Sequence, residues 1–138
     1  QELDLKFENK KKSIKQIINM QRKKTGKLFN FCFQSTSIVA NKSIRERNLL
    51  GKLGEEIGLL FQIADDFLDI KGTERIVGKP IKKDKKKGKS TLINLMGYKN
   101  ALKYAEKLKK KILLKLKKRG KNANNLIETI EFILQRNF

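Results

Sequence analysis

The sequence predicts an all-α protein, a single bundle of antiparallel helices. The 138 residues include one proline and nine glycines, which favours long regular elements over a loop-rich fold. Apolar residues recur at spacings of three and four along most of the chain, as on the buried face of a helix, and no segment alternates as a strand does. The length suffices for one domain with a hydrophobic core.

The first predicted helical stretch lies near the start of the chain. The apolar pattern from Ser13 to about Asn30 indicates one helix or two in succession, and it continues through Phe33. A break follows, with either Asn41 or Ser43 as the cap of the next helix, because both side chains can accept a hydrogen bond from the first turn.

The longest predicted helix runs from Ile44 to Ile70. Its second half, from Ile57 onwards, is apolar on nearly every side apart from Gln62 and three aspartates, so we expect it to be the most buried helix. Residues 71–89 hold the only proline and many lysines without an apolar period. We therefore expect a long loop there, and loops of this length in compact domains are often functional.

Helical spacing returns in the last third of the chain. One helix is predicted from Leu92 to Gly120, with basic residues near its C-terminus, where they interact favourably with the helix dipole. A last short helix is predicted from Asn124 to Gln135.

The composition limits the possible chemistry. There is no histidine, which excludes Ser-His-Asp and Cys-His nucleophiles, proton transfer by histidine and the usual zinc sites. The single cysteine, Cys32, cannot form an internal disulfide, so we expect a buried thiol in a reducing compartment. The longest uncharged stretch, residues 28–41, is interrupted by polar side chains and falls short of the roughly 20 apolar residues of a membrane span.

The formal net charge of +20 raises the question of a nucleic acid or an anionic membrane as partner. Lysine far outnumbers arginine, whereas proteins that read nucleic acids rely on arginine and on stacking aromatics. Because isoleucine and asparagine are also abundant, we interpret the lysine surplus as drift in an AT-rich coding sequence and expect no nucleic-acid partner.

Three aspartates on the longest predicted helix are the candidate metal ligands. Asp65 and Asp69 lie one helical turn apart on the same face, with Asp66 about 100° further round. Like charges at this spacing oppose helix formation, so we expect a cation beside them. Mg²⁺ is the natural candidate because it takes oxygen ligands and is usually held by one or two carboxylates plus substrate phosphates. The alternative is a set of solvated acids on an exposed helix edge, within the acidic group Glu55, Glu56, Asp65, Asp66, Asp69 and Glu74.

The loop before residue 91 is cationic and leads into a helix, where lysines and backbone amides can hold phosphate oxygens. Gly88-Lys89-Ser90 invites a P-loop interpretation, but Lys83 stands where that motif needs glycine and no strand precedes it. We therefore reject the P-loop. Lys79 and Lys89 remain candidate phosphate ligands, and the other loop lysines are interpreted as a solvated run.

Five short motifs occur in an order and spacing that resemble the C-terminal half of trans-isoprenyl diphosphate synthases. They are Gln1-Glu2-Leu3-Asp4-Leu5, Lys24-Thr25-Gly26, the segment from Phe61 to Asp69, Gly78-Lys79 with Asp84, and Gly88-Lys89-Ser90-Thr91. The closing Gln135-Arg136-Asn137 resembles the end of bacterial farnesyl diphosphate synthases. The resemblance implies the helical bundle of class I terpenoid (isoprenoid) synthases, with residues 1–138 as the C-terminal part of a single polyprenyl synthetase domain whose N-terminal part is absent.

The resemblance also implies a role for individual residues. Asp65, Asp66 and Asp69 match the second aspartate-rich motif, which binds Mg²⁺ bridging to an allylic diphosphate. Lys24 and Lys79 match lysines that contact this diphosphate, and Thr25 and Gln62 match residues whose dipoles lie near the developing allylic cation. More peripheral matches are Gln1, Asp4 and Asp84 around the metal cluster, Lys89 in its motif, and Arg136 on the isopentenyl diphosphate side.

The family joins isopentenyl diphosphate head-to-tail to an allylic diphosphate such as dimethylallyl or geranyl diphosphate, giving farnesyl or a similar prenyl diphosphate. The resemblance further implies a cytoplasmic homodimer without a transmembrane segment. The family's first aspartate-rich motif and its N-terminal basic site are not in these residues, so we expect the 138 residues alone to be inactive.

Two other functions stay open at this point. One is a basic helical protein that binds RNA or a membrane surface, which a steep salt dependence and indifference to Mg²⁺ would favour. The other is a degenerate relative that keeps the fold without catalysis. Product chain length is not predicted, because in the family it is set mainly near the missing motif.

Overall fold

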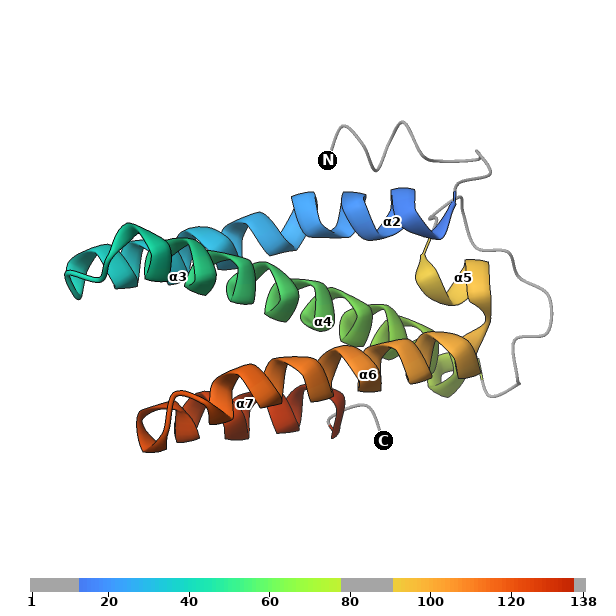
Figure 1. The fold of residues 1–138 in the computed structure, drawn as a ribbon. Coiled ribbons are helices and arrows are strands. Elements are labelled where there is room, and N and C mark those ends of the chain that lie inside the picture. The colour runs from blue at the N-terminus through green and yellow to red at the C-terminus, as the bar shows by residue number, and fades with distance from the viewer. Residues whose placement is uncertain (1–12, 78–90, 136–138) are drawn as a thin grey trace.

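The computed structural model describes residues 13–77 and 91–135, and the side chains of residues 13–70 and 91–135. All regular elements in these ranges are helical, as expected (Figure 1). The longest helix, α4, lies between a first arm built from α2 and α3 and a second arm built from α6 and α7, and it runs antiparallel to α3 and α6 (Figure 1). The elements are α2 Ile14–Gln21, η1 Arg22–Gly26, α3 Lys27–Val39, α4 Ile44–Val77, α5 Leu92–Met96, α6 Tyr98–Lys117, η2 Lys121–Ala123 and α7 Asn124–Gln135.

The first arm is two helices in succession, joined without a break by one π-helical turn. A capping box fixes its start, in which the Ser13 hydroxyl accepts from the backbone N–H of Gln16 while the Gln16 side chain accepts from the backbone N–H of Ser13. At the junction, the backbone N–H of Lys27 donates to the carbonyl of Arg22, five residues earlier, which is the π-helical pattern. The arm thus continues through Phe33, as the apolar pattern predicted.

The cap of α4 is Ser43, whose hydroxyl accepts from the backbone N–H of Glu46 at 3.3 Å. Asn41, the other candidate, instead adopts a positive φ of 51° in the turn between α3 and α4. The predicted helix end at Ile70 is wrong, because α4 continues to Val77. The residues added after Ile70 have no apolar period to signal a helix, but extending an existing helix requires no new nucleation. The start of the predicted loop is corrected accordingly, and residues 78–90 lie outside the described ranges.

The single helix predicted from Leu92 to Gly120 is also wrong, because the structure divides it at Gly97 into α5 and α6. Gly97 has φ 79° and ψ 157°, a backbone conformation that residues with a Cβ rarely adopt. Thr91 caps α5 by accepting from the backbone N–H of Asn94 at 3.2 Å. Gly120, with φ 71°, follows the basic end of α6, and α7 has the predicted bounds.

The core lies where α4 meets both arms. α4 is the main contributor, as its apolar second half predicted, with Ile57, Leu59, Leu60, Ile63, Ala64 and Phe67 at most 2% exposed. α6 and α7 complete the far side with Ala101, Ala105, Ile112, Leu116 and Ile130. A partly buried ion-pair cluster joins α4 to α6, since the buried Glu56 carboxylate contacts the ammonium groups of Lys115 at 2.6 Å and of the exposed Lys111 at 3.0 Å.

α3 leaves an apolar side in solvent in this chain. Phe31 is 67% and Leu28 62% exposed, and Cys32, next to Phe31, is exposed too. The predicted buried thiol is therefore wrong, because Cys32 lies on the side of α3 that faces away from α4. Among the described helices, none is both long enough and apolar enough to cross a membrane.

Candidate functional site

The candidate site lies where the first arm crosses the second half of α4, and Asp66 is its centre. Asp66 is half-buried and each of its carboxylate oxygens accepts one hydrogen bond from an amide. Gln21 Nε2, at the end of α2, donates to Oδ2 at 2.7 Å, and Gln62 Nε2, one turn earlier on α4, donates to Oδ1 at 3.2 Å. The two amides thus hold the plane of the carboxylate from two helices.

The hydrogen-bond chain continues from Gln62 to Thr25. The Thr25 hydroxyl, in the π-helical turn, donates to Gln62 Oε1 at 2.8 Å. Because the Gln62 amide accepts at one end and donates at the other, the direction of the chain is fixed from Thr25 through Gln62 to Asp66. The hydroxyl proton of Thr25 is used towards Gln62, so its oxygen lone pairs are left for a neighbouring positive charge.

The charge state of Asp66 depends on its surroundings. The pKa of the Asp66 carboxyl is raised to about 6, chiefly by burial away from water and in addition by the negative charge of Asp69. The hydrogen bonds from Gln62 and Gln21 and the positive charge of Lys24 act in the opposite direction. Asp66 is therefore mainly ionised at neutral pH, in a place where a second negative charge and partial burial disfavour ionisation.

Two glycines bring the helices together beside this site. A Cβ at Gly58 of α4 would lie 2.8 Å from the Cα of Gly26, at the end of the π-helical turn, and a Cβ at Gly26 would lie 3.2 Å from the backbone oxygen of Glu55. Only residues without a Cβ permit this approach of two backbones. The close crossing explains how the short side chain of Thr25 reaches α4.

The structure brings five of the predicted site residues into one electrostatic group. Thr25, Gln62 and Asp66 are joined by hydrogen bonds, and Lys24 and Asp69 both act on the Asp66 carboxyl. Asp65, the residue before Asp66 on α4, is half-buried, whereas Asp69 and Lys24 are exposed.

The carboxylates do not form a complete metal cage. Among the described residues, no three Asp, Glu or Cys side chains gather closely enough to hold a metal ion by themselves. Asp66 is hydrogen-bonded to Gln21 of α2, whereas Asp69 is exposed, although its charge acts on the Asp66 carboxyl. The donor set still fits Mg²⁺ in the way this ion usually binds, with few carboxylates and with phosphate oxygens completing the shell. The raised pKa of Asp66 fits as well, because a cation would relieve the cost of ionising it.

Half of the predicted site residues lie outside the described ranges, and their roles stay predictions. They are Gln1, Asp4, Lys79, Asp84, Lys89 and Arg136.

The acidic group seen in the sequence is divided between two uses. Glu55 accepts from Lys27 and from Asn30, both on α3, and Glu56 is paired with the two lysines of α6. Both glutamates therefore fasten the arms to α4, about two turns before the aspartates. Glu55 and Glu56 therefore have structural roles, whereas the aspartates remain the candidate metal ligands.

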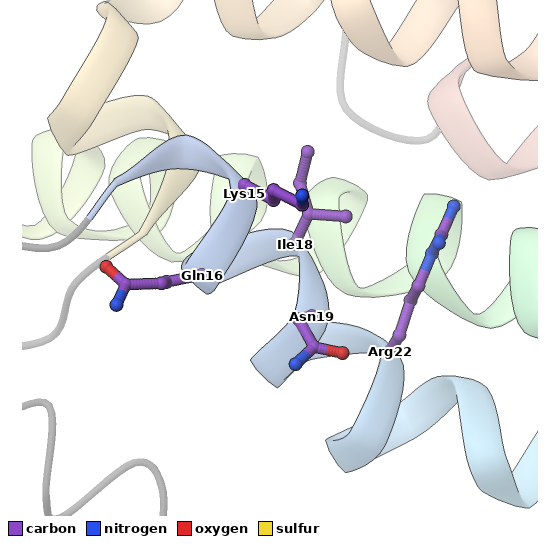
Figure 2. Close-up of a pocket in the computed structure, with 5 residues that line it drawn as sticks. All are labelled: Lys15, Gln16, Ile18, Asn19 and Arg22. Carbon is purple, nitrogen blue, oxygen red and sulfur yellow. The ribbon is translucent and has the colours of Figure 1, made fainter.

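A hollow of about 420 Å³ lies beside α2, on the side that carries Lys15, Ile18 and Arg22 (Figure 2). Lys15 and Arg22 supply its charge, and Figure 2 shows both side chains extending on the side of α2 where α4 passes behind it. Ile18, Gln16 and Asn19 complete the lining. None of the predicted site residues lines this hollow, so it is separate from the Asp66 site.

Comparison with known proteins identifies the family. The model of the polyprenyl synthetase family matches residues 1–131. The chain belongs to this family. As a polyprenyl synthetase relative, it is 37% identical over 116 residues to the short chain isoprenyl diphosphate synthase of Methanocaldococcus jannaschii, covering 84% of this chain and 34% of that protein. It is 33% identical over 141 residues to the farnesyl diphosphate synthase of Escherichia coli, covering 99% of this chain and 47% of the other.

The fold agrees with this polyprenyl synthetase assignment. The Helicobacter pylori geranyltransferase, solved with magnesium and isoprenyl diphosphate, superposes with a TM-score of 0.76 and 28% identity, over 99% of this chain and 45% of that one. The predicted isoprenoid synthase fold and the predicted resemblance are therefore confirmed. The chain spans less than half the length of each of these relatives.

Sequence reasoning missed three features of the polyprenyl synthetase site. Gln21 was not singled out, although it is a polar residue four positions after buried Ile17, on the stripe that α2 buries. Gly58 and Gly54 were also missed, although glycines four residues apart on a helix indicate a close backbone contact. The π-helical turn has no sequence signal that we can name.

Proposed function

We propose that the complete protein is a short-chain trans-prenyl diphosphate synthase, which condenses isopentenyl diphosphate with an allylic diphosphate. The observation that carries the proposal is the chain from Thr25 through Gln62 to Asp66, with the Lys24 charge acting on the same carboxylate. This arrangement combines charged groups that can bind the departing diphosphate and its metal ion with oxygen dipoles that can stabilise the developing allylic cation. Family membership and the names of the relatives support the same reaction class.

Mg²⁺ would be held by Asp65, Asp66 and Asp69, with Asp84 and Asp4 as further candidates. When bound, it would neutralise the charge that gathers on the diphosphate as the allylic carbon–oxygen bond breaks. The magnesium and isoprenyl diphosphate bound to the Helicobacter pylori enzyme support this choice of ion and substrate class.

The chain's own residues have separate tasks in this proposal. Lys24 and Lys79 would both attract the allylic diphosphate. Thr25 would turn its oxygen lone pairs towards the carbon that becomes positive, because its proton is committed to Gln62. Such fixed dipoles need no rearrangement when charge develops, which is how preorganised sites lower a barrier.

The remaining family properties are part of the proposal. Homodimer assembly, a cytoplasmic location and the positions of Gln1, Lys89 and Arg136 near the substrates are predicted from the resemblance. The RNA- or membrane-binding alternative and the degenerate relative are not favoured, because the relatives are prenyl diphosphate synthases.

The proposal is tested by Asp65→Ala in the complete protein. Turnover of labelled isopentenyl diphosphate with geranyl diphosphate should fall by orders of magnitude, while the melting temperature stays the same because Asp65 is not in the core. Glu128→Ala, on the exposed side of α7, removes an equal charge and should leave turnover unchanged. Near-normal activity of Asp65→Ala would remove the metal role from this motif.

A further inference from the structure

Gln21 is the one residue at the Asp66 site that none of the sequence motifs includes. It is 3% exposed, and its Nε2 donates to Asp66 Oδ2 at 2.7 Å, the shorter of the two amide bonds to this carboxylate. The contact joins residues 45 positions apart in sequence. It is therefore a tertiary contact between α2 and α4, made directly on a candidate metal ligand.

The contact of Gln21 with Asp66 is one of a pair. Gln21 and Thr25 are four residues apart on the first arm, and Gln62 and Asp66 are four residues apart on α4. The first arm and α4 are antiparallel, so Gln21 contacts Asp66 and Thr25 contacts Gln62. Residues four apart on a helix lie on the same face, so both side chains of each pair face the other helix.

A structural role alone does not explain a glutamine at this place. Its second amide atom, Oε1, is buried and has no hydrogen-bond partner among the described residues. A buried carbonyl without a partner is destabilising, and an apolar side chain of the same length would fill the space without that cost. The amide is useful at this position only through its donor, and the donor is directed at Asp66.

We propose that Gln21 is a positioning residue of the synthase: it fixes the Asp66 carboxylate, together with Gln62, in the orientation in which the ion is bound. The inference rests on the proposed function. The last torsion of an aspartate is soft, and one amide on one oxygen leaves the carboxylate free to turn about that contact. Two amides, one on each oxygen, hold the plane and leave one lone pair on each oxygen for a cation.

Gln21→Met in the complete protein tests the proposal. Methionine keeps the length and packing of the side chain and removes both amide atoms. Binding of Mn²⁺ in the presence of inorganic diphosphate, followed by the loss of its free electron paramagnetic resonance signal, should weaken by about tenfold, the effect expected for a group that orients a metal ligand. The melting temperature without metal should change little, because removing the unpartnered carbonyl offsets the loss of the hydrogen bond to Asp66.

Two companion variants separate the possible outcomes. Asp65→Asn should weaken Mn²⁺ binding as well, whereas Gln135→Met, at the exposed end of α7, should leave both measurements unchanged. If Asp65→Asn weakens binding and Gln21→Met does not, the positioning role is wrong and the proposed function stands. If neither variant changes binding, the metal role of the motif and the role of Gln21 both fall. A lower melting temperature with unchanged Mn²⁺ binding would make Gln21 merely structural.

Discussion

The crossing of α4 with the first arm depends on Gly58, and Gly58→Ala measures that dependence. The new Cβ would lie 2.8 Å from the Cα and 3.1 Å from the backbone nitrogen of Gly26. Carbon atoms prefer separations of about 3.5–4.0 Å, so the helices must move apart by roughly 1 Å. Overpacking of this kind costs about 1–3 kcal/mol, and the higher helix propensity of alanine returns about 1 kcal/mol.

We therefore expect Gly58→Ala to lower the free energy of unfolding by on the order of 1 kcal/mol, and by about 2 kcal/mol at most. Urea unfolding of the complete protein measures it. Turnover should fall as well, because a wider crossing stretches the contact of Thr25 with Gln62, which is 2.8 Å long. The neighbours are backbone atoms, which cannot swing away as a side chain can.

Gly51→Ala is the matched control on the same helix. The three atoms nearest to its Cβ all belong to side chains, Gln34 Nε2 at 2.7 Å, Gln34 Cγ at 2.9 Å and Asn30 Nδ2 at 3.0 Å. Side chains shift more readily than a helix backbone does, although a shift of Asn30 stretches its hydrogen bond to Glu55. The gain in helix propensity should then leave the variant as stable as the parent or more stable by up to about 1 kcal/mol. Equal stability of both alanine variants would refute the close crossing as the origin of the effect.

Three further predictions concern individual side chains. Thr25→Val keeps the shape of the side chain but removes the hydroxyl that donates to Gln62, so kcat should fall roughly 100–1000-fold by the loss of one preorganised dipole. The kinetic control is Thr129→Val, because the Thr129 hydroxyl donates to a carbonyl of its own helix. Although burial raises the pKa of Glu56, the hydrogen bonds and charges of the two α6 lysines hold it below its ordinary value of 4.5. The ion pairs therefore stabilise the fold above pH 4.5 and lose this contribution at lower pH. Because solvent screens the two lysines, Glu56→Gln should lower the free energy of unfolding by no more than about 1 kcal/mol at pH 7, with a difference that shrinks in acid. The effect of Asp66 on stability has the opposite pH dependence, because its pKa in the folded protein, about 6, lies above the ordinary 3.8. Its ionisation opposes folding as the pH rises through this window. Without Mg²⁺, Asp66→Asn should therefore be more stable than the parent at pH 7.5 and lose that advantage below pH 3.8. An Asp66→Asn variant less stable than the parent at pH 7.5 would contradict the raised pKa.

Local signals in the sequence located several elements well. The start of α4 follows from a capping serine, Ser43, and the bounds of α7 follow from its apolar spacing. The resemblance named Thr25, Gln62 and Asp66, which the structure joins in one hydrogen-bond chain. These features depend on residues near one another in sequence or on motifs with a fixed order.

What the sequence did not predict depends on distant partners or on backbone conformation. A glycine inside a helical pattern is tolerated at a cost of about 1 kcal/mol, so the spacing around Gly97 could not show that the helix breaks there. Gln21 acquires its role from a residue 45 positions away, and Glu56 from lysines on another helix. The position of Cys32 in solvent likewise depends on which side of α3 meets α4.

The most direct test of the proposed function is the transfer of labelled isopentenyl diphosphate to geranyl diphosphate with and without Mg²⁺, comparing the complete protein with these 138 residues alone. We predict turnover by the complete protein that stops when Mg²⁺ is removed, and none by the 138 residues, which span less than half of their relatives. A complete, folded protein that binds both diphosphates and still gives no prenyl product would contradict the synthase function.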